Sequence, residues 1–402
     1  MRRPRLSTSM LAALVAVALV LVVAAVALGR TAQPSGRTVV TVRLWDQQVA
    51  AAYRESFARF THEHPEIEVR VNVVSYATYF DTLRTDMERA AADGTLVVAG
   101  THTGNGNFTV NNAATLSISG AVTGSGAYTV NSGTFNLTGT VTGAGNLTVG
   151  TTALPSTATV SGSGSYTSAI GKDVLLGNTV AGSVGVLNVT GNGEVKVTNN
   201  AANNGSIQLG NFAGASGVIN QSGGTVSLES NIVFGSAGSG ATGAYGFYNQ
   251  TGGQLLHNGG TGSGARFRIG NAAGSNVGLY YLSGGSATYT NGNNSIEVGG
   301  SGTFVTGSNA IGVLYVSGTG SMTGATSSLQ VANQTAGGAG TATTIGQVTI
   351  GGAGSTAASI TVASVNTSSS NASQPGTATI NLLGGGTLVT GNISKSANGT
   401  ST

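Results

Sequence analysis

The stretch Gly278-Leu-Tyr-Tyr-Leu-Ser-Gly284 decides the fold, because its pattern recurs along the chain. The pattern is glycine, two apolar residues, asparagine or tyrosine, any residue, serine or threonine, and glycine. Its starts lie 32, 29, 32 and 34 residues apart, at 185–191, 217–223, 246–252, 278–284 and 312–318. Degraded copies follow at 346–351 and 380–384. Recurrence at such a period predicts a repeat architecture in which each unit packs on the next.

Two further patterns extend the array. Upstream of each motif we expect a short strand that ends in glycine, at 175–177, 208–210, 233–235, 268–270 and 297–299. Closer to the N-terminus, a unit of glycine, any residue, an aromatic residue or leucine, and threonine recurs at spacings of 20, 19 and 19 residues, at 106–110, 126–130, 145–149 and 164–168. The spacings divide the array into a short-period part, residues 94–170, and a longer-period part, residues 171–402.

Units of this length, made of short strands and glycine-rich turns without helices, predict one coil each of a parallel β-helix, a mainly β solenoid. Strands of successive coils are then about 4.8 Å apart. The motif's inward residues should form apolar stacks inside the coils, namely Leu187, Ile219, Tyr248, Tyr280 and Leu314. Asn188, Asn220 and Asn249 share one motif position and predict a ladder of side-chain amides.

Composition changes abruptly near Gly94. Residues 1–93 hold 20 of the 29 Lys, Arg, Asp and Glu of the chain, and their basic residues are all arginine. The net charge of +3 and the absence of a basic cluster in the array argue against a nucleic-acid partner. The chain has no cysteine, which excludes disulfides, thiolate metal sites and a cysteine nucleophile.

The first 30 residues predict export. Arg2, Arg3 and Arg5 precede an apolar run at 11–28, the pattern of a signal peptide or of a retained signal anchor. We therefore expect an extracellular or cell-surface protein that meets a membrane only through this N-terminal helix.

Residues 31–93 predict a small βαβα fragment: a strand at 38–45, a helix at 50–60, a strand at 67–74 and a helix at 79–92. The stretches Val40–Asp46, Phe57–Val69 and Tyr76–Tyr79 resemble the start of the extracellular sugar-binding proteins of ABC importers. The resemblance implies that Trp45 stacks on a sugar and that Asp46 hydrogen-bonds it. The second lobe of that family does not follow, and packing in a core is the alternative role for Trp45.

The array resembles the passenger repeats of bacterial autotransporters and related surface proteins. The likeness is carried by the glycine–aromatic–Thr-Val units and by Ser-Gly-Gly units such as the one at 283–285. It implies a β-helix exposed outside the cell.

The array offers few groups for catalysis. Its acids are Asp173, Glu194, Glu229 and Glu297. Repeat register places Arg268 and Glu297 at equivalent positions in adjacent coils, which predicts a solvent-facing ion pair rather than a catalytic pair. The four histidines are scattered, so we expect no metal site, no cofactor and no enzymatic activity.

One binding function is open. Aromatic residues gather in neighbouring coils, and outward-facing members could stack on sugars. The candidates are Tyr245, Tyr281 and Tyr289. Packing inside the coils is the alternative for each of them.

Three hypotheses about function remain. The leading one is an exported, non-enzymatic β-helix that acts as a surface stalk or adhesin, with carbohydrate or cell-surface components as partners. The second is an incomplete sugar-binding component of an ABC importer. The third is a chimeric chain, joined at about Gly94, without an integrated function.

Overall fold

The computed structural model describes residues 38–44, 47–73, 94–199, 205–235, 243–258, 266–270, 275–290, 295–300, 309–332, 343–367, 376–395 and 400–401. They fall into two compact units, Met1–Val97 with Asn112–Leu116, and Val98–Asn111 with Ser117–Thr402.

The first unit contains the predicted strand, helix and strand. β1 (Thr38–Leu44) and β2 (Ile67–Val73) form a parallel pair in which Val40 lies beside Val69, and α2 (Gln47–Glu63) connects them. Tyr53 and Phe57 lie one turn apart on α2 with ring centroids 5.6 Å apart. The predicted N-terminal helix and the predicted helix at 79–92 lie outside the described residues.

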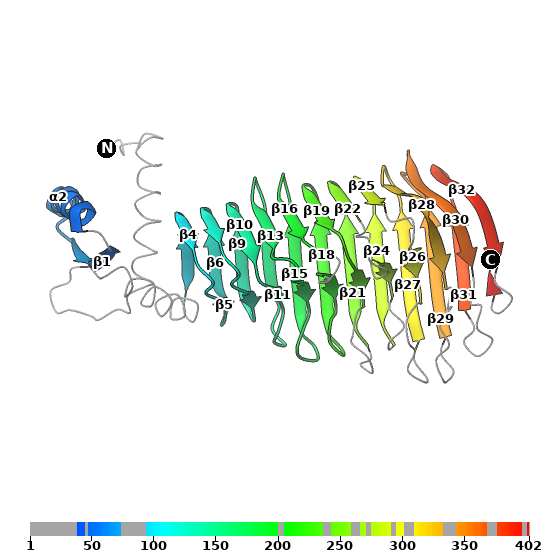
Figure 1. Ribbon diagram of the computed structural model, residues 1–402, viewed down its shortest axis with the longest axis horizontal. Helices are drawn as coiled ribbons and strands as arrows, with labels where there is room; N and C mark the ends of the chain where they lie inside the picture. The colour runs from blue at the N-terminus through cyan, green and yellow to red at the C-terminus, as the bar shows by residue number, and fades with distance from the viewer. Residues whose placement is uncertain are drawn as a thin grey trace, which may run out of the picture. The chain divides into compact units, whose positions relative to one another are not determined.

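The larger unit is a parallel β-helix, so the predicted fold class is confirmed (Figure 1). Each coil contributes one strand to a 12-stranded sheet and further strands to a 19-stranded sheet. Strand colour in Figure 1 changes steadily along the stack, because the coils follow one another in sequence order.

The 12-stranded sheet contains the strands that carry the seven-residue motif. Its members are β3 (Thr95–Val98), β6 (Ala114–Ile118), β9 (Gly133–Leu137), β12 (Ser156–Val160), β15 (Val184–Val189), β18 (Ser216–Gln221), β21 (Tyr245–Gln250), β24 (Val277–Leu282), β27 (Asn309–Val316), β29 (Thr343–Ile350), β31 (Gly376–Leu382) and β33 (Thr400–Ser401).

The 19-stranded sheet contains two strands of each early coil. One series is β4 (Thr101–Thr103), β7 (Ala121–Thr123), β10 (Thr140–Ala144), β13 (Ser165–Ser168), β16 (Glu194–Val197), β19 (Thr225–Leu228), β22 (Gln254–His257) and β25 (Ser286–Tyr289). The other is β5 (Phe108–Val110), β8 (Tyr128–Val130), β11 (Leu147–Val149), β14 (Val174–Leu176), β17 (Ile207–Leu209), β20 (Ile232–Phe234), β23 (Phe267–Ile269) and β26 (Ser295–Val298). In the last coils the two series merge into β28 (Ser321–Val331), β30 (Ala358–Thr367) and β32 (Gly386–Lys395).

The register of the 12-stranded sheet confirms the motif alignment. The predicted inward residues pair directly from coil to coil and are fully buried: Leu187, Ile219, Tyr248, Tyr280 and Leu314. Alternation along each strand sends the intervening residues outward. The apolar core is therefore a set of continuous stacks that run through the coils.

The first glycine of the motif permits a close approach between strands. A Cβ added at Gly246 would lie 2.3 Å from the amide nitrogen of Gly235 and 2.6 Å from the Cα of Phe234. Gly235 itself has a φ of 68°, which suits glycine, and it turns the chain after β20. The two glycine columns of the sequence therefore meet at one corner of the coil.

One register prediction is wrong. The sequence groups the unit at 164–168 with the units at 126–130 and 145–149, but Tyr166 pairs with Val141 of β10 and not with Leu147. The residue beside Leu147 in the next coil is Val174. The coil becomes longer at this point. A residue 19 positions after Leu147 therefore lies in the other strand series of the 19-stranded sheet.

Candidate ligand-binding face

Three columns of outward side chains run along the 12-stranded sheet over β15, β18, β21, β24 and β27. We call these columns the binding face. The first column is apolar and half-buried: Val186, Val218, Phe247, Leu279 and Val313. The second carries amides and phenols: Asn188, Asn220, Asn249, Tyr281 and Tyr315. The third carries hydroxyls just after the strands: Thr190, Ser222, Thr251 and Ser283.

A groove of about 270 Å³ lies on this face. It is lined by Thr159, Asn188, Thr190, Asn220, Gln221, Ser222, Asn249 and Thr251. The amide and hydroxyl columns therefore enclose a concave surface, and its walls are uncharged groups that both donate and accept hydrogen bonds.

The predicted amide ladder forms only in part. Asn220 donates from Nδ2 to Oδ1 of Asn188 at 3.1 Å, and Asn188 donates to the hydroxyl of Thr159 at 3.4 Å. Among the described residues, the side chain of Asn249 has no hydrogen-bond partner, although its backbone lies in register with Asn220. The ladder thus ends one coil early, and the amide of Asn249 is available to a ligand.

Two tyrosines continue the column beyond Asn249. Tyr281 and Tyr315 lie side by side in adjacent coils with ring centroids 5.1 Å apart and an interplanar angle of 20°. The hydroxyl of Ser317 lies 3.2 Å from the hydroxyl of Tyr281. Both rings are half-buried. The face therefore changes from amides to a stacked aromatic pair at β24.

The structure separates the predicted sugar-stacking residues. Tyr245 is 53% exposed and lies at the margin of the binding face, since Phe247 and Asn249 follow it at alternate positions on β21. Tyr281 lies on the face itself. Tyr289 is 2% exposed, and the centroid of its ring lies 4.6 Å from that of the His257 ring. It therefore faces the core and offers no surface to a ligand. Trp45 and Asp46 lie outside the described residues.

Tyr315 lies on the binding face but was not among the site residues predicted from the sequence. The signal was present, because Tyr281 and Tyr315 occupy the same position of the seven-residue motif. Tyr315 lies outside the two neighbouring coils in which aromatic residues gather, but it belongs to the motif column of Tyr281.

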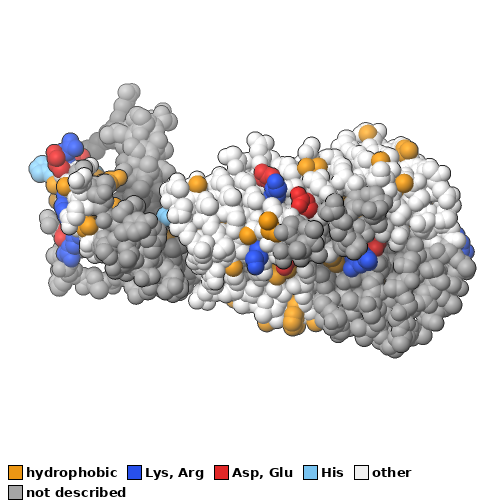
Figure 2. Space-filling view, viewed as in Figure 1, with side chains coloured by type: hydrophobic (Ala, Val, Ile, Leu, Met, Phe, Trp, Pro, Cys, Tyr) orange, Lys and Arg blue, Asp and Glu red, His pale blue; other side chains and the backbone are white. Residues whose placement is uncertain are grey.

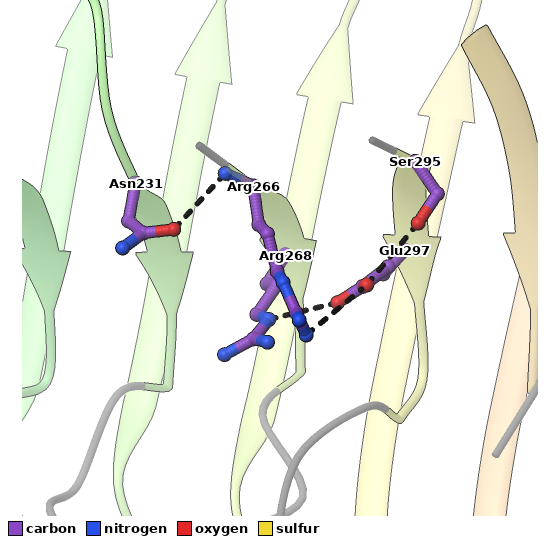
Figure 3. Close-up of polar contacts among 5 residues, drawn as sticks. All are labelled: Asn231, Arg266, Arg268, Ser295 and Glu297. Carbon is purple, nitrogen blue, oxygen red and sulfur yellow. Dashed lines mark hydrogen bonds and ion pairs between the residues drawn. The ribbon is translucent and has the colours of Figure 1, made fainter. Parts of the chain in front are cut away.

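The other candidate is a charged cluster on the 19-stranded sheet (Figure 3). Arg268 pairs with Glu297 in register, and its Nε lies 2.8 Å from Oε2 of Glu297. Arg266 Nη1 lies 3.8 Å from Oε1 of the same carboxylate. Ser295 donates its hydroxyl to that oxygen at 3.1 Å. The predicted ion pair is therefore present.

The prediction that this pair faces solvent is wrong. Glu297 is 4% exposed, and the side chain of Arg268 is 17% exposed. Burial explains the geometry, because a carboxylate removed from water needs several donors to remain charged. The carboxylate is held by two guanidinium groups and by the hydroxyl of Ser295. The cluster is suited to holding adjacent coils together.

His257 lies in the core beneath this region. It is fully buried, and burial lowers its pKa to about 4. Burial also raises the pKa of Tyr289, with a further contribution from the carboxylate of Glu297. Within the described ranges, no group of three or more His, Asp or Glu could hold a metal ion. No helix in the described part of the chain is long and apolar enough to cross a membrane.

Comparison with known proteins gives no relative for this chain. No protein-family model matches it, and neither the curated proteins nor the solved structures yield a match. The function must therefore be argued from the geometry of the binding face.

Proposed function

We propose that the protein is an exported, non-enzymatic β-helix that acts outside the cell as a stalk or adhesin. The observation that supports this most strongly is the binding face: two uncharged columns are held in register over five consecutive coils, and a column of hydroxyls follows the strands of four of them. The N-terminal basic and apolar pattern of the sequence supports export.

The solenoid suits extension and lateral contact. Each coil hydrogen-bonds only to its neighbours, so length is added without changing the surface chemistry of the coils already present. Threonine repeats also line the outer side of the 19-stranded sheet, where Thr103, Thr123 and Thr142 succeed one another in register. Such faces offer the same contact repeatedly along one direction.

The test is the location of the full chain in the cells that produce it. Intact cells are treated with a protease that does not enter them, and the remaining protein is measured by immunoblot beside a cytoplasmic marker. We expect loss of the protein, or its appearance in the medium, while the marker stays intact. Full protection until the cells are broken would overturn the proposal.

The importer alternative remains a prediction. The residues that it would use, Trp45 and Asp46, lie outside the described part of the chain, and no observation on the described residues favours it. We propose no enzymatic activity because the charged cluster already has a structural role. Its buried carboxylate is paired with two guanidinium groups and links adjacent coils.

A further inference from the structure

We infer that the binding face takes an extended, uncharged polysaccharide that lies along the stack of coils. The inference rests on the proposed function, because it supplies the exported β-helix with its ligand class. Four features of the face carry it: a half-buried aromatic pair, a free amide, the absence of charge, and the spacing of the columns.

The tyrosine pair supplies an aromatic platform beside the groove. Tyr315, in the following coil, covers one face of the Tyr281 ring. The other face of the Tyr281 ring is turned toward the preceding coil, where Asn249 lies in register, so the accessible part of this half-buried ring lies beside the free amide. A sugar ring presents apolar C–H groups on its faces, and these groups pack on aromatic rings of this kind.

The free amide supplies polar recognition next to that platform. An asparagine side chain offers two donors and one carbonyl acceptor, and adjacent hydroxyls on a sugar can use both kinds of group. Asn249 has none of these engaged by a described residue, and Thr251 adds an exposed hydroxyl in the same groove. A buried or half-buried polar group gains most from a partner that satisfies it.

The absence of charge selects the ligand. Among the described residues of the larger unit, the charged side chains belong to other strands and loops, and none lies in the three columns. An anionic polymer or an anionic lipid surface would meet no counter-charge there. A neutral polymer loses little on leaving water for such a surface, because its hydroxyls exchange water for amides and hydroxyls.

The spacing of the columns favours an extended polymer over a compact ligand. Equivalent side chains recur in each coil, about 4.8 Å apart along the stack. The groove itself spans several coils, since it extends from Thr159 on β12 to Asn249 on β21. A chain of repeating units can therefore repeat its contacts from one coil to the next.

The experiment is affinity electrophoresis of the full chain in native gels. The gels contain a neutral polymer (hydroxyethylcellulose, mixed-linkage β-glucan or galactomannan), an anionic polymer (alginate or polygalacturonate), or none. The variants are Asn249→Asp, which introduces charge into the groove, and Tyr281→Ala, which removes the ring. Tyr281→Phe keeps the ring, and Thr288→Ala on the 19-stranded sheet is the matched control. Circular dichroism verifies that each variant retains its β structure.

We expect at least one neutral polymer to retard the wild type and neither anionic polymer to do so. Asn249→Asp and Tyr281→Ala should weaken that retardation about tenfold, which corresponds to about 1.4 kcal/mol. Tyr281→Phe should bind more tightly than Tyr281→Ala because it keeps the ring, and Thr288→Ala should bind as the wild type does. Retardation by an anionic polymer alone, equal binding by Asn249→Asp and Thr288→Ala, or no retardation by any polymer would overturn the inference.

The result is separable from the test of export. If the protein is exposed at the cell surface but binds no neutral polymer, the ligand inference fails and the proposed function stands. The protein is then a stalk without a glycan ligand. A dimer held through the binding face would appear as a doubled mass in light scattering that Tyr281→Ala halves, and it would contradict the inference because the face would then be occupied by a second copy.

Discussion

The hydroxyl of Tyr248 donates a 2.6 Å hydrogen bond to Oε1 of Gln221, inside the stack of coils. Gln221 in turn donates from Nε2 to the carbonyl oxygens of Gly224 and Gln254, at 3.2 and 3.0 Å. Tyr280 repeats the arrangement with Gln250 one coil later, at 2.5 Å. The hydroxyls of these two core tyrosines are thus satisfied from coil to coil, which permits large aromatic side chains at positions otherwise filled by leucine and isoleucine.

Removal of the Tyr248 hydroxyl should lower the stability of the fold. Tyr248→Phe leaves Oε1 of Gln221 buried without its donor, so we expect a loss of about 1–3 kcal/mol in the free energy of unfolding. Urea denaturation followed by circular dichroism measures it. Tyr245→Phe is the control, because Tyr245 is 53% exposed and its variant should stay within about 0.5 kcal/mol of the wild type. Equal stability of the two variants would contradict the account of the core.

The glycine corner makes a sharper prediction. Gly246→Ala places a methyl group 2.3 Å from a backbone nitrogen, so the coil must shift, and we expect destabilisation of about 3 kcal/mol. Gly106→Ala is the control, since a Cβ there meets nothing within 4 Å. The melting temperatures of the two variants, measured by thermal unfolding, test this prediction. A melting temperature of Gly246→Ala equal to that of Gly106→Ala would contradict the observed register.

The charged cluster should behave as a buried link. Glu297→Gln removes the charge but keeps the shape, and it leaves Arg268 and Arg266 without their shared carboxylate. We expect a loss of about 3 kcal/mol. Adding Arg268→Gln to that variant should recover part of the loss, because one uncompensated guanidinium disappears. Glu194→Gln, on the half-buried part of β16, should cost much less in the same urea titration. If both glutamate variants unfold at the same urea concentration, the link contributes nothing.

The buried histidine predicts a dependence of stability on pH. Burial lowers the pKa of His257 to about 4 from an ordinary value of 6.5. Between these values the unfolded chain binds a proton that the folded chain does not, so stability falls as the pH falls from about 6.5 toward 4. The contribution is on the order of 3 kcal/mol across that window.

His257→Leu should remove this contribution. Leucine occupies the equivalent position in the preceding coil, where Leu228 lies in register with His257. We expect the unfolding free energy of the variant to fall less steeply with decreasing pH than that of the wild type. His102, whose pKa burial also lowers, is common to both proteins and cancels in the comparison. Parallel pH profiles would mean that His257 has the same pKa in the folded and the unfolded chain, which would contradict the prediction.

Much of the β-helix could be predicted from the sequence because its motif has a fixed length. Five residues between two glycines leave no freedom in register, so Ile219 and Tyr248 can be assigned to one stack from the sequence alone. The spacing between units carried less information. It misassigned Tyr166, since a lengthened coil and a change of strand series give the same 19-residue interval.

The site could be predicted only in part. Alternation places Tyr281 outward and Tyr280 inward, but it cannot show that Tyr289 packs against His257 in the core. Register predicted the pair of Arg268 and Glu297, whereas their burial depends on surrounding elements that no local pattern describes. The sequence could not predict that the side-chain amide of Asn249 lacks a partner among the described residues, because the motif column predicts an unbroken ladder.

The most direct test of the central claim is a polysaccharide and glycan array probed with the full chain, with its Asn249→Asp variant and with a Trp45→Ala variant. The account predicts binding to neutral glycans by the wild type and by Trp45→Ala, and loss of that binding in Asn249→Asp. Binding that survives Asn249→Asp but disappears in Trp45→Ala would contradict it and would assign recognition to the N-terminal fragment.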